Sequence, residues 1–140
     1  MWRKPSREIA VVLDTNVFIS GTFWPHTKSN EILRMWKSGA FRLIYSEDTL
    51  AELTRILNEF KISLSQKNIR KIVSEIRLRG TRVLQKGYIA ISEDPDDNKF
   101  IEAAVEGNAR YIVSQDKHLL RIGEYNGIEI LTPENFLRKL

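Results

Sequence analysis

The sequence predicts an α/β fold of three layers, in which a central, mainly parallel sheet lies between two layers of helices. Strand-like and helical segments alternate along the chain, which is typical of parallel strands joined by crossover helices. The first strand-like segment, 9–13, is a continuous apolar run rich in β-branched residues, as expected for a strand buried on both faces. The length of 140 residues, without repeats or linkers, is the usual size of one domain, so we expect residues 1–140 to form a single domain.

The first third of the chain is expected to contain two strands and two helices. The strand at 9–13 leads into a short helix over 17–20 and a loop over 21–29. Residues 30–37 are apolar on one side at helical spacing and predict a second helix. A second short strand is expected over 41–45.

Two longer helices are expected in the middle of the chain. Ser46 is a typical N-cap, because acidic residues follow it in the first helical turn, and the apolar spacing behind it continues to about Lys61. The next helix begins at Ser65 and is ended by Gly80. Its apolar face is formed by Ile69, Ile72, Val73 and Ile76.

The second half continues the alternation after an irregular segment. Residues 82–91 predict a strand that is interrupted at Gly87. The remaining expected elements are, in order, a helix from 94 to about 107, a strand over 110–114, a short helix ending near 120, a strand over 128–131 and a helix over 133–140.

Positive charge is concentrated in the middle of the chain. The net charge is +4, but the segment 61–86 carries +7 and the remainder −3. Clustered basic residues favour a polyanionic partner such as RNA, although a solvated helix face explains the pattern equally well. The residues expected to lie mostly opposite the apolar face, and so to be candidates for RNA binding, are Lys67, Arg70, Lys71 and Arg77.

Composition excludes several kinds of site. The chain has no cysteine, which excludes disulfides, cysteine-ligated zinc and thiol nucleophiles. No apolar stretch approaches the ~20 residues of a membrane span, and the apolar run behind the basic N-terminus is too short for a signal peptide. Glycine-rich nucleotide-binding motifs are also absent. We therefore expect a cytoplasmic protein that does not enter a membrane.

Four acidic residues occupy positions where a parallel sheet places its functional site. Asp14 directly follows the first strand, and Asp116 lies just beyond the strand at 110–114. The carboxyl ends of parallel strands share one edge of the sheet, so these two side chains are expected to meet. Asp97 lies on the buried side of the helix before that strand, and Glu52 flanks the apolar stripe of the helix that follows Ser46.

Each acid also has a purely structural explanation. Residues 94–97 are typical of a helix start, with a capping aspartate followed by proline. Asp14 and Asp116 could cap the helices that follow them, and Glu52 could be a surface acid. Together, however, carboxylates gathered at one sheet edge repel each other unless a cation lies among them.

The ligand types indicate which cation would fit. Oxygen ligands without cysteine suit Mg²⁺ or Mn²⁺ rather than zinc. A pair of such ions can activate water and stabilise the leaving oxygen during attack on a phosphodiester. The two histidines, His26 and His118, lie in no recognisable nucleophile–base arrangement. The chemistry expected is hydrolysis without a protein nucleophile.

Four segments of the chain resemble, in order, the signature segments of PIN domains. They are residues 12–17 (Val-Leu-Asp-Thr-Asn-Val), 46–53 (Ser-Glu-Asp-Thr-Leu-Ala-Glu-Leu), 94–100 (Asp-Pro-Asp-Asp-Asn-Lys-Phe) and 113–120 (Val-Ser-Gln-Asp-Lys-His-Leu-Leu). The segment 130–137 resembles the usual closing strand and helix. The closest resemblance is to single-domain prokaryotic PIN proteins related to the VapC group, which are described as toxins of toxin–antitoxin pairs.

The resemblance implies a site and partners. It implies Mg²⁺- or Mn²⁺-dependent cleavage of RNA, an antitoxin protein as partner and a homodimer. It also implies that the cations are held, directly or through water, by Asp14, Glu52, Asp97 and Asp116. Nearby polar groups that match positions beside the acids are Thr15, Asn16, Ser114 and Asp94. The run of acids at 94–97 leaves open whether Asp94 or Asp96 replaces Asp97 as a ligand.

The sequence therefore favours a metal-dependent endoribonuclease, with two alternatives. One is a non-catalytic PIN module that binds RNA or protein, because a fold and its ligand set do not guarantee activity. The other is a phosphatase with an aspartate nucleophile after the first strand. Such enzymes have a second aspartate two residues on, where this chain has Asn16.

Overall fold

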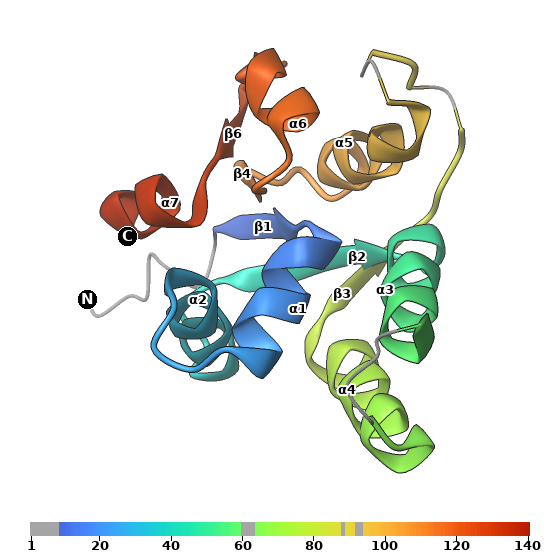
Figure 1. Ribbon diagram of the computed structural model, residues 1–140. Coiled ribbons are helices and arrows are strands. Elements are labelled where there is room, and N and C mark those ends of the chain that lie inside the picture. Colours follow the sequence, from blue (N-terminus) through green and yellow to red (C-terminus); the bar gives the residue numbers. More distant parts are fainter. Residues whose placement is uncertain (1–8, 60–63, 88, 92–93) are drawn as a thin grey trace, which may run out of the picture.

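The computed structural model describes residues 9–59, 64–87, 89–91 and 94–140 (Figure 1). The strands are β1 (Ala10–Leu13), β2 (Arg42–Ser46), β3 (Thr81–Val83), β4 (Tyr111–Val113), β5 (Glu124–Tyr125) and β6 (Ile128–Leu131). The helices are α1 (Thr15–Phe23), α2 (Lys28–Lys37), α3 (Glu47–Glu59), α4 (Gln66–Arg79), α5 (Asn98–Glu106), α6 (Lys117–Ile122) and α7 (Pro133–Lys139), with a 3₁₀ turn, η2 (Pro95–Asp97), before α5. The basic N-terminus and the expected helix end at Lys61 lie outside the described residues.

The six strands form one sheet in the order β3-β2-β1-β4-β6-β5. Each neighbouring pair is parallel except β5 with β6, which is antiparallel. The apolar runs of β1 and β4 lie at the centre of this sheet, and both of their faces are buried. This burial explains why their sequences are continuously apolar rather than alternating.

Helices cover both faces of the sheet. α5 and α6 pack on one face, where Val12 and Ile112 belong to one apolar cluster. α1, α2, α3, α4 and α7 pack on the other face, where Val11 and Val113 belong to a second cluster. Figure 1 shows α5 and α6 above the sheet, with α1, α2 and α4 below it. The predicted three-layer α/β/α fold with a mainly parallel sheet is confirmed.

The first helix is longer than the predicted segment 17–20, because it continues through Gly21 to Phe23. A Cβ atom at Gly21 would lie 2.7 Å from Cδ1 of Leu33 on α2. The glycine therefore allows α1 and α2 to pack closely, rather than ending the helix. The predicted loop over 21–29 is correspondingly shorter.

Two other segments differ from the prediction. β3 covers only Thr81–Val83, whereas a longer strand over 82–91 was expected. The short antiparallel strand β5 was not predicted. It is joined to β6 by Asn126 and Gly127, which have φ angles of 49° and 83°, as in the two-residue turns that connect tight hairpins.

Within the part of the chain that the structure describes, the helices do not combine the length and hydropathy that crossing a membrane requires.

Candidate metal centre

The candidate site lies where the order of the strands reverses. β1 has β2 on one side and β4 on the other, and ligands of open α/β sheets bind at such a switch point. Leu13 of β1 pairs with Val113 of β4. The residues that follow them, Asp14 and Ser114, therefore leave the sheet side by side at its carboxyl edge.

Ser114 joins two of the predicted acids. Its hydroxyl donates a hydrogen bond of 2.6 Å to Oδ2 of Asp14 and accepts one of 2.9 Å from the backbone N–H of Asp116. Asp116 also caps α6, since its Oδ1 accepts a hydrogen bond of 2.7 Å from the backbone N–H of His118. The structural explanation considered for Asp116 is thus correct, and it coexists with the position of this residue beside Asp14.

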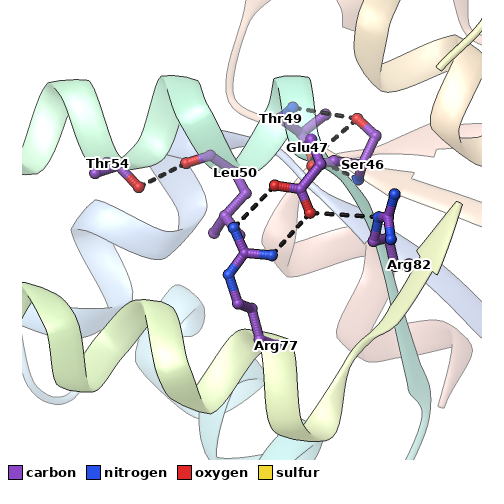
Figure 2. Close-up of polar contacts among 7 residues, drawn as sticks. All are labelled: Ser46, Glu47, Thr49, Leu50, Thr54, Arg77 and Arg82. Atoms are coloured by element: carbon purple, nitrogen blue, oxygen red, sulfur yellow. Dashed lines mark hydrogen bonds and ion pairs between the residues drawn. The ribbon is translucent and has the colours of Figure 1, made fainter. Parts of the chain in front are cut away.

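The start of α3 is fixed before the chain reaches Glu52. The backbone N–H of Ser46 donates to the Thr49 hydroxyl at 3.0 Å, and the backbone N–H of Thr49 donates to the Ser46 hydroxyl at 3.2 Å. Figure 2 shows this cap, together with two arginines that reach Glu47 from α4 and β3. Arg77 donates to both carboxylate oxygens of Glu47 at 2.8 Å, and Arg82 lies 3.4 Å from the same carboxylate.

Glu52 lies on the second turn of α3 and faces α1 and α5. The Thr15 hydroxyl donates to Oε2 of Glu52, and Nζ of Lys99 lies 2.6 Å from Oε1. The side chains of Glu52 and Lys99 are each 17% exposed, so this ion pair is largely removed from solvent. Both carboxylate oxygens of Glu52 therefore have a partner from the chain itself.

Asp97 is buried at the end of η2, and only 6% of it is exposed. Asp94 opens this turn, because its Oδ1 accepts a hydrogen bond of 3.0 Å from the backbone N–H of Asp96. Asp96 is exposed. Among the described residues, Oδ2 of Asp97 is buried and has no hydrogen-bond partner. These environments favour Asp97 over Asp96 as the inward-facing acid of this run.

Burial and the charges of the other acids raise the pKa values of Asp14 and Asp97. Burial raises the pKa of Asp14 to about 6, the Ser114 hydroxyl opposes this rise, and the charges of Glu52 and Asp116 add to it. Burial also raises the pKa of Asp97 to about 7, and the charges of Asp116, Asp94 and Asp14 add to that rise. The charges of Glu52 and Asp116 thus raise the pKa of Asp14, and those of Asp14 and Asp116 raise the pKa of Asp97. The four residues come from four separate segments of the chain.

Comparison with known proteins identifies the family. A family model described as a PIN domain matches residues 10–118. The chain belongs to the PIN-domain family. This family is generally one of nucleases, and the resemblance noted in the sequence is confirmed at the level of the family. A search among curated proteins found no match.

Solved structures share the fold of this PIN domain. A chain of VapBC-1 from nontypeable Haemophilus influenzae aligns with a TM-score of 0.59 at 17% identity, over 90% of this chain and 99% of that chain. A chain of VapBC2 from Rickettsia felis, bound to a DNA fragment from their promoter, aligns with a TM-score of 0.56 at 14% identity, over 87% and 97%. A chain of FitAcB from Neisseria gonorrhoeae aligns with a TM-score of 0.52 at 15% identity, over 89% and 98%.

The predicted neighbours of the acids have different environments in this PIN domain. Thr15 and Ser114 are buried and hydrogen-bonded to Glu52 and Asp14, as expected for groups that orient ligands. Asn16 is exposed, and Asp94 caps η2. Of the four predicted residues, Thr15 and Ser114 therefore contact these acids through their side chains, and Asn16 contacts Asp14 through its backbone.

The predicted metal site is not preformed. Among the described residues, no group of three or more histidine or acidic side chains already has the arrangement of a metal site. The contacts above explain why, since Thr15 and Lys99 hold Glu52 and Ser114 holds Asp14. In this PIN domain, the carboxylates of Glu52 and Asp14 are thus bound by the chain's own donors, whereas Oδ2 of Asp97 has no partner among the described residues.

The basic residues of α4 fall into two groups. Lys67, Arg70 and Lys71 are exposed. Arg77, predicted with them, is instead bound to Glu47 through two hydrogen bonds. Lys61, at the start of the predicted basic segment, lies outside the described residues. The positive surface available on α4 is therefore narrower than the sequence indicated.

A cleft of about 640 Å³ opens beside Glu52, between α3, α5 and the segment after β3. Its charged lining residues are the bases Arg55 and Lys99 and the acids Asp48, Glu52, Asp96 and Glu102. Glu102, which is only 1% exposed, accepts hydrogen bonds from the backbone N–H groups of Lys86 and Gly87 and so holds that segment against α5. Neither Lys99 nor Glu102 was predicted from the sequence. The position of Glu102 within the apolar run 100–104 could have indicated a buried acid.

Proposed function

We propose that this PIN domain is a divalent-metal-dependent endoribonuclease that hydrolyses phosphodiester bonds of RNA. The observation that carries the proposal is that the Ser114 hydroxyl joins the Asp14 carboxylate to the backbone of Asp116 at the switch point of the sheet. The charges of both acids also raise the pKa of Asp97, which comes from a third segment. Membership of a family generally composed of nucleases supports the same reaction.

The residues present fit a divalent cation. Oδ2 of Asp97 is a buried acceptor without a hydrogen-bond partner among the described residues, which is costly unless a ligand satisfies it. The surrounding donors are carboxylate oxygens, which suit Mg²⁺ or Mn²⁺. We assign the cation to Asp14, Asp97 and Asp116, with Glu52 at the margin of the centre. A bound cation would supply the positive charge that makes water nucleophilic near neutral pH and stabilises the leaving oxygen.

The chain's own residues would orient the centre and admit the substrate. Ser114 holds Asp14 and Asp116 in register through one hydroxyl group. Thr15, the residue after Asp14, holds Glu52 through its hydroxyl group. In the adjoining cleft, the exposed Arg55 would be the basic residue available to a phosphodiester backbone, because Lys99 is paired with Glu52. No step requires a protein nucleophile.

The variant Asp14→Asn tests this proposal. We expect it to abolish Mn²⁺-dependent cleavage of single-stranded RNA while circular dichroism shows a folded protein. Glu134→Gln is the matched control, because Glu134 is an exposed acid of α7 whose partner is Arg138. Equal cleavage by Asp14→Asn and wild-type protein, or cleavage in excess chelator, would contradict the proposal and favour a non-catalytic binding module.

We further propose that the chain acts in the cytoplasm as the toxin of a toxin–antitoxin pair and assembles as a homodimer. The support is the fold shared with chains of the VapBC and FitAcB structures. Expression of the wild-type chain should arrest growth, and Asp14→Asn should relieve the arrest. Growth arrest that persists in Asp14→Asn would argue against an RNA-cleaving toxin. Light scattering tests the homodimer.

A further inference from the structure

We infer that the ammonium group of Lys99 neutralises Glu52 and takes the place of a second divalent cation. The chain would then bind one divalent cation, held by Asp14, Asp97 and Asp116. This inference rests on the proposed function. It concerns a residue that acts through Glu52 and is therefore a positioning residue.

On the Glu52 side, the chain itself satisfies the carboxylate. Thr15 donates to Oε2, and Nζ of Lys99 lies 2.6 Å from Oε1. Each partner in the ion pair is only 17% exposed, so the two charges are largely removed from water. Displacing Lys99 from Glu52 would leave a poorly solvated ammonium group without its counter-ion, which is strongly unfavourable. Direct binding of a divalent cation to Glu52 would therefore have to offset the free energy lost when Lys99 is displaced.

Asp97, in contrast to Glu52, still has an acceptor that could bind a cation. Oδ2 of Asp97 is buried without a hydrogen-bond partner among the described residues, and Asp97 as a whole is 94% buried, since its exposure is 6%. The Ser114 hydroxyl joins Asp14 to the backbone of Asp116, and Asp97, at the end of η2, is the third acid assigned to the cation. A cation would therefore be bound more readily at Asp97 than at Glu52.

The charges lead to the same conclusion. Three carboxylates around one divalent cation keep a net negative charge, while Glu52 and Lys99 neutralise each other. A second divalent cation at Glu52 would lie close to the Lys99 ammonium group, and like charges at contact distance repel strongly in a site of low polarity. Lys99 is also anchored beside Phe100, with Nζ 5.6 Å from the ring centroid, which holds the ammonium group near α5.

The test is the number of Mn²⁺ ions bound per chain, measured by electron paramagnetic resonance and isothermal titration calorimetry on the full chain. Wild-type protein should bind one Mn²⁺, and Lys99→Met should bind two, because the Glu52 carboxylate is then free to take a cation. Lys99→Arg keeps the positive charge and should bind one. Lys139→Met is the matched control, because Lys139 pairs with Glu129 on the opposite flank of the fold and its loss should leave one Mn²⁺ bound.

Two Mn²⁺ ions bound to wild-type protein, or one bound to a folded Lys99→Met variant, would overturn the role of Lys99. If Lys99→Met does not fold, Lys99→Gln replaces it in the same comparison. The failure of this inference is distinguishable from the failure of the proposed function. Wild-type protein that binds two Mn²⁺ and loses RNA cleavage on Asp14→Asn retains the proposed function and refutes only the role of Lys99. Wild-type protein that binds no Mn²⁺ and cleaves equally well with Asp14→Asn refutes both.

Discussion

The Ser114 hydroxyl donates a 2.6 Å hydrogen bond to Oδ2 of Asp14, across a separation of 100 positions in the sequence. The alignment of Leu13 with Val113 in neighbouring parallel strands produces this contact. The same hydroxyl accepts a hydrogen bond from the backbone N–H of Asp116. One small side chain therefore joins the carboxylate of Asp14 to the backbone of Asp116.

Replacing Ser114 should reduce activity without unfolding the protein. Ser114→Ala removes both hydrogen bonds of the hydroxyl, and the loss of a group that orients a metal ligand typically costs about 10- to 100-fold in metal affinity or activity. Steady-state cleavage of RNA and Mn²⁺ titration measure the effect. Ser29→Ala is the control, since the buried Ser29 hydroxyl has no hydrogen-bond partner among the described residues. Equal losses in the two variants would show that Ser114 acts only through packing.

The two neighbouring acids of η2 should differ in effect. Asp97→Asn should remove most of the RNA cleavage, because Asp97 is buried and interacts with Asp14 and Asp116. Asp96→Asn should keep most of it, because Asp96 is exposed. RNA cleavage at saturating Mn²⁺ compares them. The reverse order of activities would mean that Asp96 is the ligand.

The stability of the metal-free protein should fall as the pH rises. Burial raises the pKa of Asp14 to about 6 and that of Asp97 to about 7, from 3.8 in each case. The folded state therefore binds these protons more tightly than the unfolded state. The resulting stabilisation is complete below the unfolded value and is lost as the pH rises through 6 and then 7.

Thermal unfolding in chelator should show this loss, which is on the order of a few kcal/mol between roughly pH 5 and pH 8. The double variant Asp14→Asn/Asp97→Asn should have a flatter dependence on pH. Mn²⁺ should stabilise wild-type protein more at the higher pH, because the ligands must be deprotonated. Parallel stability curves for wild-type and double-variant protein would contradict the assigned environments.

The exposed basic residues of α4 should contribute to RNA affinity by neutralising phosphate groups. Reversing the charge of Arg70 and Lys71 should weaken RNA binding and reduce its salt dependence, by about 0.7 in the logarithmic slope for each phosphate that the variant no longer neutralises. Arg138→Glu on α7 is the control, and Mn²⁺ affinity should not change. Fluorescence anisotropy over a range of salt concentrations measures this. Unchanged binding would exclude α4 from the RNA-binding surface.

The positions of the acids could be predicted from the sequence because simple patterns govern them. Asp14 and Asp116 each follow a buried apolar strand, and parallel strands end at the same edge of a sheet. The sequence favoured Asp97, which shares a helical side with Ile101, but left Asp94 and Asp96 open as alternatives. These inferences need only local periodicity and one topological rule.

Other features depend on contacts between distant segments and could not be predicted in this way. Lys99 has the pattern of a surface lysine, and its contact with Glu52 on α3 appears only once α3 and α5 pack beside each other. The hydrogen bonds between Arg77 on α4 and Glu47 on α3 likewise join two helices, so the spacing of residues within α4 could not reveal them. The two-residue strand β5 is too short for an alternating pattern to be recognised.

Diffraction from crystals soaked in Mn²⁺ tests the central claim most directly, because anomalous scattering locates the ion without prior assumptions. We predict an anomalous peak in direct contact with carboxylate oxygens of Asp14, Asp97 and Asp116. The peak should be absent from crystals of Asp97→Asn. A peak at unrelated surface acids, or none at this edge of the sheet under conditions that support RNA cleavage, would contradict the account.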